Sequence, residues 1–215
     1  MHEAGIEWVR AGVGFPFEDE EMTVLSEKFK ANVQTIKKWR SEGFQIMGIT
    51  PLYGMMYAQK GSPSLTFRRF LPAWLGTVDE DRFYHAMTEA MAYAARELRD
   101  DVSWYQISNE MDITRFRGEM TMEQAARYMY ACAKGIKRGN PDAKVGINTS
   151  CMTNPESSYF YKILYDDQSD VRFDYAGVDY YFGSHHPGTP YDWAPTIDQI
   201  TALTHRPIII AEWGY

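Results

Sequence analysis

Short β-rich runs alternate with longer amphipathic stretches along the whole chain, and this alternation constrains the fold more than any other feature. It predicts a parallel α/β architecture, because a crossover helix usually joins each strand to the next parallel strand. The runs are rich in Ile, Val, Tyr, Phe and Trp, as strands are. We expect strands over residues 6–10, 44–50, 103–107, 144–148, 175–181 and 207–212.

The stretches between these runs carry apolar residues at helical spacing. We expect helices within residues 22–39, 83–98 and 121–139, from Pro155 onward, and around 197–203. The third of these opens with Thr121 and Gln124 in a capping-box pattern, and the fourth has Pro155 at its first position. The Met and aromatic residues along these stretches are expected to form the core.

The two ends indicate that the architecture is incomplete. Residues 1–5 are expected to form the last turn of a helix, and the chain stops just past a strand. A parallel strand needs cover on both faces. The 215 residues therefore predict a single domain over 1–215, a (β/α)₈ TIM barrel that lacks parts of its first and last β/α units and retains about strands two to seven.

Three connections that follow strand ends are long, namely residues 51–78, 111–120 and 182–195. In a (β/α)₈ barrel, the loops after the carboxyl ends of the strands build the active site. We therefore expect a functional site on this face of the barrel.

Charge and hydropathy exclude several classes of partner. The net charge is −7 and no stripe of Lys or Arg interrupts it, so a nucleic acid is not an expected partner. The apolar runs are far shorter than the roughly 20 residues of a membrane span. Aromatic residues make up 15% of the chain, which suits both core packing and stacking against the flat faces of sugar rings.

Two glutamates lie at or just past strand ends. Glu110 stands in Ser-Asn-Glu-Met, and Glu212 stands in Ala-Glu-Trp-Gly-Tyr. Parallel barrel strands all end at the same rim, so residues this far apart in sequence can face each other. Cleavage of a glycosidic bond requires such a pair, one acid to protonate the leaving oxygen and one carboxylate to attack the sugar or to activate water.

Asn-Glu after one apolar strand and Glu-Trp-Gly after an apolar run three strands later resemble clan A of the retaining glycoside hydrolases. This clan includes many cellulases, mannanases, xylosidases and galactosidases, with catalytic glutamates on barrel strands four and seven. The resemblance implies hydrolysis of β-glycosidic bonds by double displacement, with Glu110 as acid/base and Glu212 as nucleophile. It implies no metal and no organic cofactor. A carboxyl separation of roughly 5–5.5 Å is expected, because retention requires it.

The resemblance extends to four further residues. Asn109 matches an asparagine that binds the substrate 2-hydroxyl, although it could instead cap the following segment. Arg10 matches an arginine that keeps the nucleophile ionised, and the alternative is a salt bridge of the barrel rim. Tyr181 matches a tyrosine that contacts the nucleophile. Tyr180 could take that role instead, since strand alternation lets only one of the two face the site.

Other candidates are weighed as substrate contacts or as ordinary structure. His185 and His186 could reach sugar hydroxyls, form a simple turn or bind a metal, but no zinc-ligand spacing supports the last. Aromatic residues that could stack on sugars, or merely pack in the core, are Trp213, Tyr53, Trp74 and Trp193.

Two competing functions remain. The incomplete barrel could be a non-catalytic carbohydrate-binding domain or an inactive fragment, whose open edges would favour self-association or pairing with another chain. It could also be a metal-dependent hydrolase that uses His185 or His186. The non-catalytic domain would bind a carbohydrate as a ligand, and the glycoside hydrolase would bind a carbohydrate as its substrate. An extracellular or periplasmic location is suggested only by the polysaccharide substrates that the resemblance implies.

Overall fold

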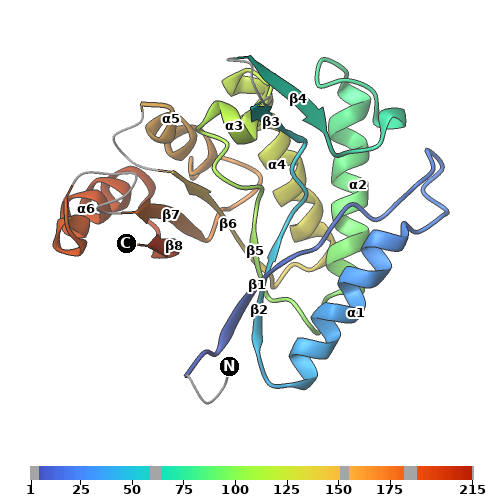
Figure 1. Cartoon of the computed structure of the whole chain (residues 1–215), viewed down its shortest axis with the longest axis horizontal. Helices are drawn as coiled ribbons and strands as arrows, with labels where there is room; N and C mark the ends of the chain where they lie inside the picture. Colours follow the sequence, from blue (N-terminus) through green and yellow to red (C-terminus); the bar gives the residue numbers. More distant parts are fainter. Residues whose placement is uncertain (1–4, 59–63, 151–154, 182–187, 215) are drawn as a thin grey trace.

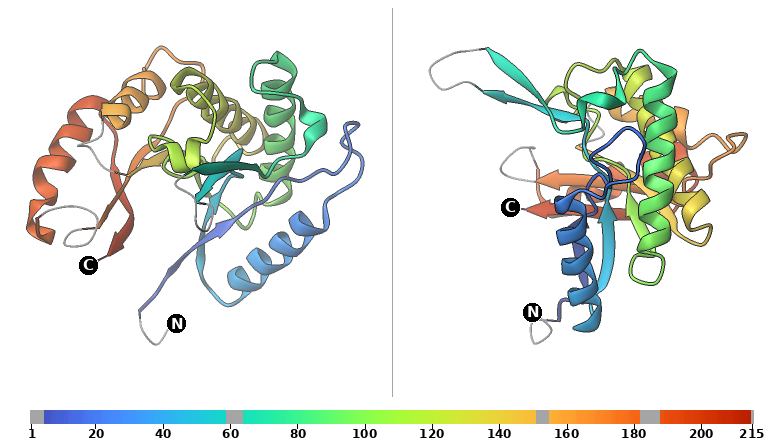
Figure 2. Two further views of the ribbon diagram at one scale, coloured as in Figure 1. Left: turned by 45° about the horizontal axis from the view of Figure 1, so that its top comes forward. Right: turned by 90° about the vertical axis from the view of Figure 1, so that its right-hand side faces the viewer.

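The computed structural model describes residues 5–58, 64–150, 155–181 and 188–214. Its main sheet has six strands in the order β1-β2-β5-β6-β7-β8, and every neighbouring pair is parallel. The sheet curls, and its helices lie on the outer side (Figure 1, Figure 2). The strands are β1 (Trp8–Gly12), β2 (Gln45–Ile49), β5 (Trp104–Gln106), β6 (Lys144–Thr149), β7 (Tyr175–Tyr181) and β8 (Ile208–Gly214).

Helices follow the strands, as in a β/α barrel. The α-helices are α1 (Glu27–Ser41), α2 (Asp81–Glu97), α3 (Thr114–Arg117), α4 (Met122–Gly139), α5 (Pro155–Leu164) and α6 (Trp193–Thr204), with short 3₁₀ turns η2 (Ala73–Leu75) and η3 (Pro190–Asp192). Helices α2 and α4 pack closely because Gly135 and Gly139 leave no side chain between them. A Cβ at Gly135 would lie 2.4 Å from the carbonyl oxygen of Thr88.

The expected fold is confirmed. The chain forms an incomplete (β/α)₈ barrel, with the six strands in the expected sequence order. The capping box of Thr121 and Gln124 is present at the start of α4. Helix α1 begins only at Glu27, after the N-cap Ser26, so Met22 and Leu25 precede it. Residues 1–4, expected to be helical, lie outside the described residues.

The inner side of the curled sheet has two layers of side chains, because alternate residues of each strand face the same way. The lower layer is aromatic: Trp104 lies 6.2 Å from Trp8 and 5.3 Å from Tyr175 between ring centroids. The upper layer, one step nearer the carboxyl ends, is polar and contains Arg10 and Gln106. A candidate site therefore lies on the face where barrel active sites are built.

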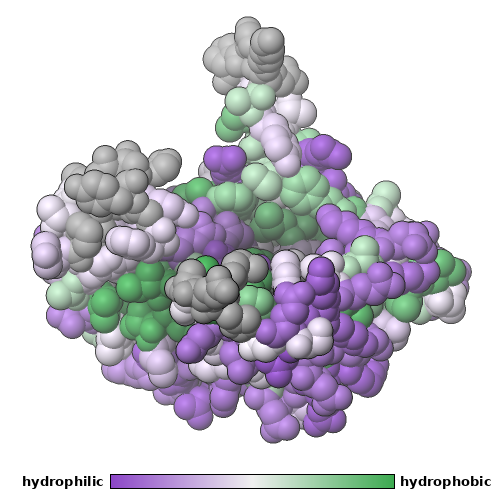
Figure 3. Space-filling view, turned by 60° about the horizontal axis from the view of Figure 1, so that its bottom comes forward, coloured by the Kyte–Doolittle hydropathy of each residue, from purple (hydrophilic) through white to green (hydrophobic). Residues whose placement is uncertain are grey.

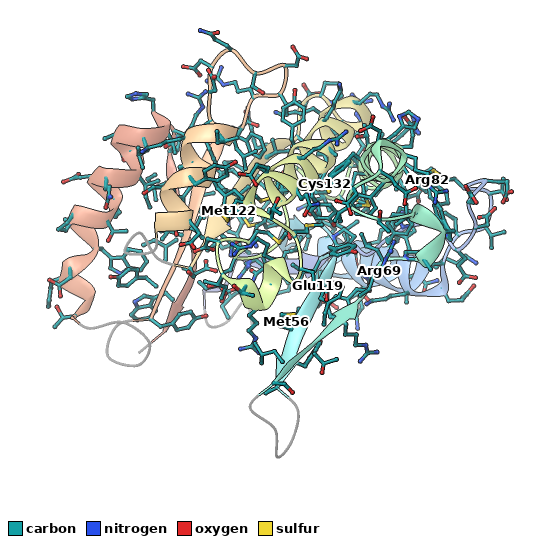
Figure 4. The ribbon with its side chains drawn as sticks, turned by 90° about the horizontal axis from the view of Figure 1, so that it is seen from above. Met56, Arg69, Arg82, Glu119, Met122 and Cys132 are labelled. Atoms are coloured by element: carbon teal, nitrogen blue, oxygen red, sulfur yellow. The ribbon has the colours of Figure 1, made fainter. Side chains whose placement is uncertain are left out.

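The first long connection contains an antiparallel hairpin, which the sequence patterns did not indicate. Strands β3 (Gly54–Ala58) and β4 (Leu65–Arg69) pair with each other and project from the body of the barrel (Figure 2). Its base packs against the segment of α3. The Phe67 ring fits over Gly118, where a Cβ would come within 2.4 Å of it, and Met56 and Glu119 lie in this region (Figure 4).

Arg69 fastens the end of this hairpin to the loop that follows. Its guanidinium donates hydrogen bonds to the carbonyl oxygens of Leu71, Pro72 and Gly76, at 2.9, 2.6 and 2.8 Å. It also lies over the Tyr53 ring, 5.4 Å from the centroid. The segment after β4 is thus held in a defined position. Among the described residues, no helix combines the length and apolar character that crossing a membrane requires.

Candidate active site

Glu212 lies near the carboxyl end of β8, where two groups from other strands bind its carboxylate. Arg10 of β1 donates from Nη1 to Oε1 of Glu212 at 2.8 Å, and Tyr181 of β7 donates from its hydroxyl to Oε2 at 2.6 Å. The side chains of Arg10 and Glu212 are 26% and 27% exposed, so the ion pair borders on solvent. The hydrogen bond to Glu212 raises the pKa of Tyr181 well above 10, which keeps that hydroxyl a donor.

A chain of amides connects Arg10 to Glu110. Nη2 of Arg10 donates to Oε1 of Gln106 at 2.8 Å and lies 3.4 Å from Oδ1 of Asn109. Asn148 of β6 donates to the same Asn109 oxygen at 3.0 Å, and its own Oδ1 accepts from the backbone N–H of Glu110 at 3.2 Å. The strands β1, β5 and β6 thus fix the position of the segment that carries Glu110.

The backbone at Glu110 has an unusual conformation. Its φ angle is +40°, and that of Ser108 is +62°. Left-handed φ values in residues other than glycine cost of order 1–3 kcal/mol and are concentrated at functional sites. Ser108 is held there because its buried N–H donates to the Thr50 hydroxyl at 2.8 Å. This tight turn directs Glu110 from the end of β5 toward the upper layer.

Glu110 is suited to donate a proton. Burial raises its pKa to about 7, and the negative charges of Asp112 and Glu212 act in the same direction. A hydrogen bond with Asp179 and the charge of Arg10 oppose the shift. Because the charge of Glu212 affects this pKa, the two carboxyl groups interact electrostatically. The distance between them, expected to be roughly 5–5.5 Å, stays a prediction.

Four polar residues of the site were missed from the sequence: Gln106, Asn148, Asp112 and Asp179. Asp112 is buried and accepts from the Ser150 and Ser157 hydroxyls at 2.6 and 2.9 Å. Asp179 is fully buried, and burial, followed by the charges of Glu212 and Glu110, raises its pKa to about 8. Strand alternation could have identified Asp179, because it lies two residues before Tyr181 on the same face.

A cleft of about 850 Å³ leads away from Glu212 toward the loops after β1 and β2. Arg10, Asn109 and Glu212 line one end. The walls come from the segment between β1 and α1 and from the segment after β4, where Phe70, Leu71 and Pro72 contribute. Figure 3 shows a hollow below the projecting hairpin, with apolar residues inside it and polar residues along its rim.

Several expected substrate contacts do not lie in this cleft. Tyr180 is buried on the opposite face of β7 and packs 5.2 Å from Trp193, so Tyr181, not Tyr180, faces Glu212. Trp213 is 60% exposed, but strand alternation puts it on the face of β8 opposite Glu212. Tyr53 is buried and stacks on Phe67 at 5.3 Å.

Of the other candidates, the two tryptophans pack in the core and the two histidines lie outside the described residues. Trp74 is half-buried and packs 5.9 Å from Phe15, and Trp193, the first residue of α6, is buried against Tyr180, so both are packing residues. For both residues the sequence left sugar stacking and core packing open, and their positions in the structure fit core packing. His185 and His186 lie outside the described residues.

The fold and site define one class of protein: an open part of a (β/α)₈ barrel with two glutamates at the carboxyl rim. Solved structures similar to this chain include the GH53 catalytic domain of Ignisphaera aggregans, with 19% identity and a TM-score of 0.62. The β-glycosidase of the hyperthermophile Thermosphaera aggregans has 13% identity and a TM-score of 0.67. The β-mannanase of the blue mussel Mytilus edulis has 12% and 0.62.

These matches cover 99%, 99% and 100% of this chain but 58%, 66% and 76% of the respective structures. The chain therefore spans only part of the length of the proteins it resembles. At this level of identity the likeness establishes the shared fold. No family model matches the sequence, and no curated protein matches it either.

Proposed function

We propose that this chain is the catalytic barrel of a retaining β-glycosidase, with Glu212 as nucleophile and Glu110 as general acid/base. The observation that carries the proposal is the unequal environment of the two glutamates. Arg10 and Tyr181 bind the carboxylate of Glu212 from two sides, whereas burial raises the pKa of Glu110 to about 7. Two carboxyl groups in such different environments suit an ionised nucleophile and a protonated acid.

In the first step, a carboxylate oxygen of Glu212 attacks the anomeric carbon and the bond to the leaving oxygen breaks. Glu110 gives its proton to that oxygen, so that an alcohol departs and a glycosyl ester on Glu212 remains. The ion pair and hydrogen bond from Arg10 and Tyr181 orient the attacking carboxylate. The Glu212 carboxylate loses its negative charge as the ester forms, so the bonds from Arg10 and Tyr181 weaken. They strengthen again when Glu212 leaves as a carboxylate, which favours hydrolysis of the ester.

In the second step, water attacks the anomeric carbon of the ester. Glu110, now a carboxylate, takes a proton from that water, and Glu212 leaves as a carboxylate. The sugar is released with its original anomeric configuration, and Glu110 is again protonated. Atoms and charges balance over the cycle, and neither step needs a metal or an organic cofactor.

Asn109 is suited to bind the hydroxyl next to the anomeric carbon. Its Oδ1 accepts from Arg10, Gln106 and Asn148, so its Nδ2 is the group directed to a ligand. An amide donor to the 2-hydroxyl strengthens as the oxocarbenium ion develops and so stabilises the transition state more than the bound substrate.

The substrate that best fits the cleft is an oligosaccharide. A cleft of about 850 Å³ is near the upper end of ordinary ligand pockets, which are roughly 300–1,000 Å³. Phe70 is 42% exposed at its wall and lies 6.4 Å from Tyr57, which offers an aromatic surface for a sugar ring. Residues 1–215 would then belong to one catalytic barrel that lacks parts of its first and last β/α units.

The most direct experiment is incubation with 2-deoxy-2-fluoro β-glycosides that carry a good leaving group, followed by intact-mass measurement and peptide mapping. We expect one covalent adduct, on Glu212, and none in Glu212→Gln. A label on another residue would contradict the assignment of the nucleophile. Sugar binding by the folded protein without any adduct or turnover would instead favour a non-catalytic carbohydrate-binding domain.

A further inference from the structure

The inner face of β1 carries one residue beyond the two layers of side chains. Trp8, Arg10 and Gly12 alternate along this strand, so Gly12 faces inward at its carboxyl end. Gly12 is exposed and lines the cleft. Apart from its chain neighbours, no heavy atom of the described residues would lie within 4 Å of a Cβ built there. The cleft is therefore open next to Arg10, where a longer side chain would enter it.

Asn32 of α1 gives the same part of the cleft a fixed polar wall. Its Nδ2 donates a hydrogen bond to the carbonyl oxygen of Val13 at 3.2 Å. The amide lies over Gly14, which has a φ of +82°, and a Cβ at Gly14 would come within 2.9 Å of Nδ2. Only glycine combines this backbone conformation with so close an approach. Because Asn32 lines the cleft and its Nδ2 is engaged, its Oδ1 is the atom suited to accept a hydrogen bond from a ligand hydroxyl.

The lining of the cleft indicates on which side of the scissile bond this part lies. In the proposed reaction, Glu212 attacks one sugar ring and Asn109 binds the 2-hydroxyl of the same ring. Glu110 instead acts on the leaving oxygen. Asn109 and Glu212 line the cleft, whereas Glu110 is not among the described residues that do. The cleft therefore continues from the ring that is transferred to Glu212, away from the leaving group.

The charges of the cleft favour a neutral ligand. Besides Arg10 and Glu212, the charged side chains that line it within the described ranges are Glu18 and Lys28, one of each sign. Phe70 adds a partly exposed aromatic ring to the wall. A neutral sugar suits such a lining, because its ring has apolar C–H faces and its hydroxyls both donate and accept hydrogen bonds.

We propose that the cleft beside Gly12 is a second sugar-binding subsite, which holds a neutral sugar on the non-reducing side of the ring that Glu212 attacks. Asn32 is its polar contact. This inference rests on the proposed glycosidase function. It makes Gly12 a specificity-determining residue, because the missing side chain lets at least two linked sugars bind on this side. The preferred first product is therefore a disaccharide or a longer unit, not a single sugar.

Pairs of 4-nitrophenyl β-glycosides that carry one sugar or two test the subsite, in the glucose, mannose and galactose series. In the series that the protein cleaves, we expect kcat/KM to be about tenfold higher for the disaccharide glycoside, because only this substrate reaches the second subsite. The intact disaccharide should be the first sugar released. Release of a single sugar first would place the second sugar on the leaving-group side and overturn the proposal.

Variants of the subsite should change this preference in graded steps. The preference for the disaccharide glycoside should fall partly in Gly12→Ala and disappear in Gly12→Leu, whose longer side chain enters the cleft. Asn32→Ala should lower it roughly three- to tenfold through the lost hydrogen bond. The matched control is Gln34→Ala, an exposed amide of α1 outside the cleft lining, which should keep the wild-type preference. An unchanged preference in Gly12→Leu would contradict the subsite.

A binding measurement separates this inference from the proposed reaction. In nitrogen-15-labelled protein, β-1,4-linked disaccharides of glucose, mannose or galactose should shift the signals of the Gly12 backbone amide and the Asn32 side-chain amide. The corresponding monosaccharides should not shift them. Such shifts in a protein without glycosidase activity would support the subsite and count against the proposed function only. Equal turnover of both glycosides without these shifts would support the reaction and overturn the subsite.

Discussion

The two layers inside the curled sheet are built from the same strands but differ in what holds them together. In the lower layer, Trp8, Trp104 and Tyr175 pack ring against ring, and the contact area stabilises the fold. In the upper layer, Arg10 and Gln106 from two of those same strands form hydrogen bonds with defined donors and acceptors. On each of these strands, the residue that packs in the core and the residue that belongs to the candidate site are only two positions apart.

This difference teaches that a substitution has different consequences in the two layers. In the lower layer, the loss of a polar atom should reduce stability without changing the chemistry, because this layer is held together mainly by buried area. In the upper layer, such a loss should also change the chemistry, because each polar group there forms a hydrogen bond with another polar group in a partly buried environment. We therefore expect substitutions in the upper layer to reduce catalysis and substitutions in the lower layer to reduce stability.

The largest expected effect is that of Glu212→Gln. Removal of a nucleophile should lower kcat by a factor on the order of 10⁴ or more, with little change in the melting temperature. Turnover of aryl β-glycosides measures the first and calorimetry the second. Glu97→Gln, which affects a surface pair with Lys37, is the matched control and should retain full activity. Equal losses in both variants would mean that Glu212 has no special role.

Arg10→Met should have the next largest effect. It removes the guanidinium from Glu212 but keeps a long, unbranched side chain in the middle of β1. Loss of a charged donor at a reacting group typically costs about 10²–10³ in kcat. Steady-state kinetics on aryl glycosides tests this, and a change confined to KM would show that Arg10 acts on substrate binding instead.

A matched pair on β7 compares the layers most directly. Tyr181→Phe removes the donor to Glu212, and a hydrogen bond to a charged group is worth about 1.5–3 kcal/mol, so kcat/KM should fall roughly ten- to a hundred-fold. Tyr175→Phe removes the hydrogen bond to the carbonyl of Tyr105 and should cost about 1 kcal/mol of stability with unchanged kinetics.

Denaturant unfolding and initial rates, both measured on the two β7 variants, separate these outcomes. The distinction between the layers fails if Tyr175→Phe reduces kcat/KM as much as Tyr181→Phe does.

Phe70→Ala should have the smallest effect. Loss of an aromatic surface at the cleft wall removes about 0.5–1.5 kcal/mol of stacking, which would raise KM for an oligosaccharide a few-fold. KM for a short aryl monoglycoside should stay the same. An equal rise for both substrates would indicate that Phe70 supports the catalytic end of the cleft rather than its extension.

The sequence predicted the architecture well because strand and helix periodicities are local properties. Glu110 and Glu212 could be found because each lies at or just past the end of an apolar run. Asp179 was missed because it lies inside such a run, where strand residues are normally apolar. The β3–β4 hairpin was missed because its pairing is antiparallel and lies within a connection between parallel strands.

The sequence predicted which strand or connection carries each residue better than it predicted whether the side chain is exposed. The sequence left Tyr53 open between sugar stacking and core packing, and in the structure the hairpin covers it, since Arg69 and Phe67 contact its ring. Tyr180 and Tyr181 could not be separated without the strand register, which depends on partners distant in sequence.

The contact between Arg10 and Glu212 joins residues 202 positions apart, on the two edge strands of the main sheet. The ion pair cannot form until β8 as well as β1 has left the ribosome, so the earlier strands must remain folded or protected before the site exists. Contacts of such long sequence separation also slow folding. Activity would therefore report the completion of folding, and a cut in the chain between β1 and β8 would turn the site into a sensor for reassembly of the two pieces.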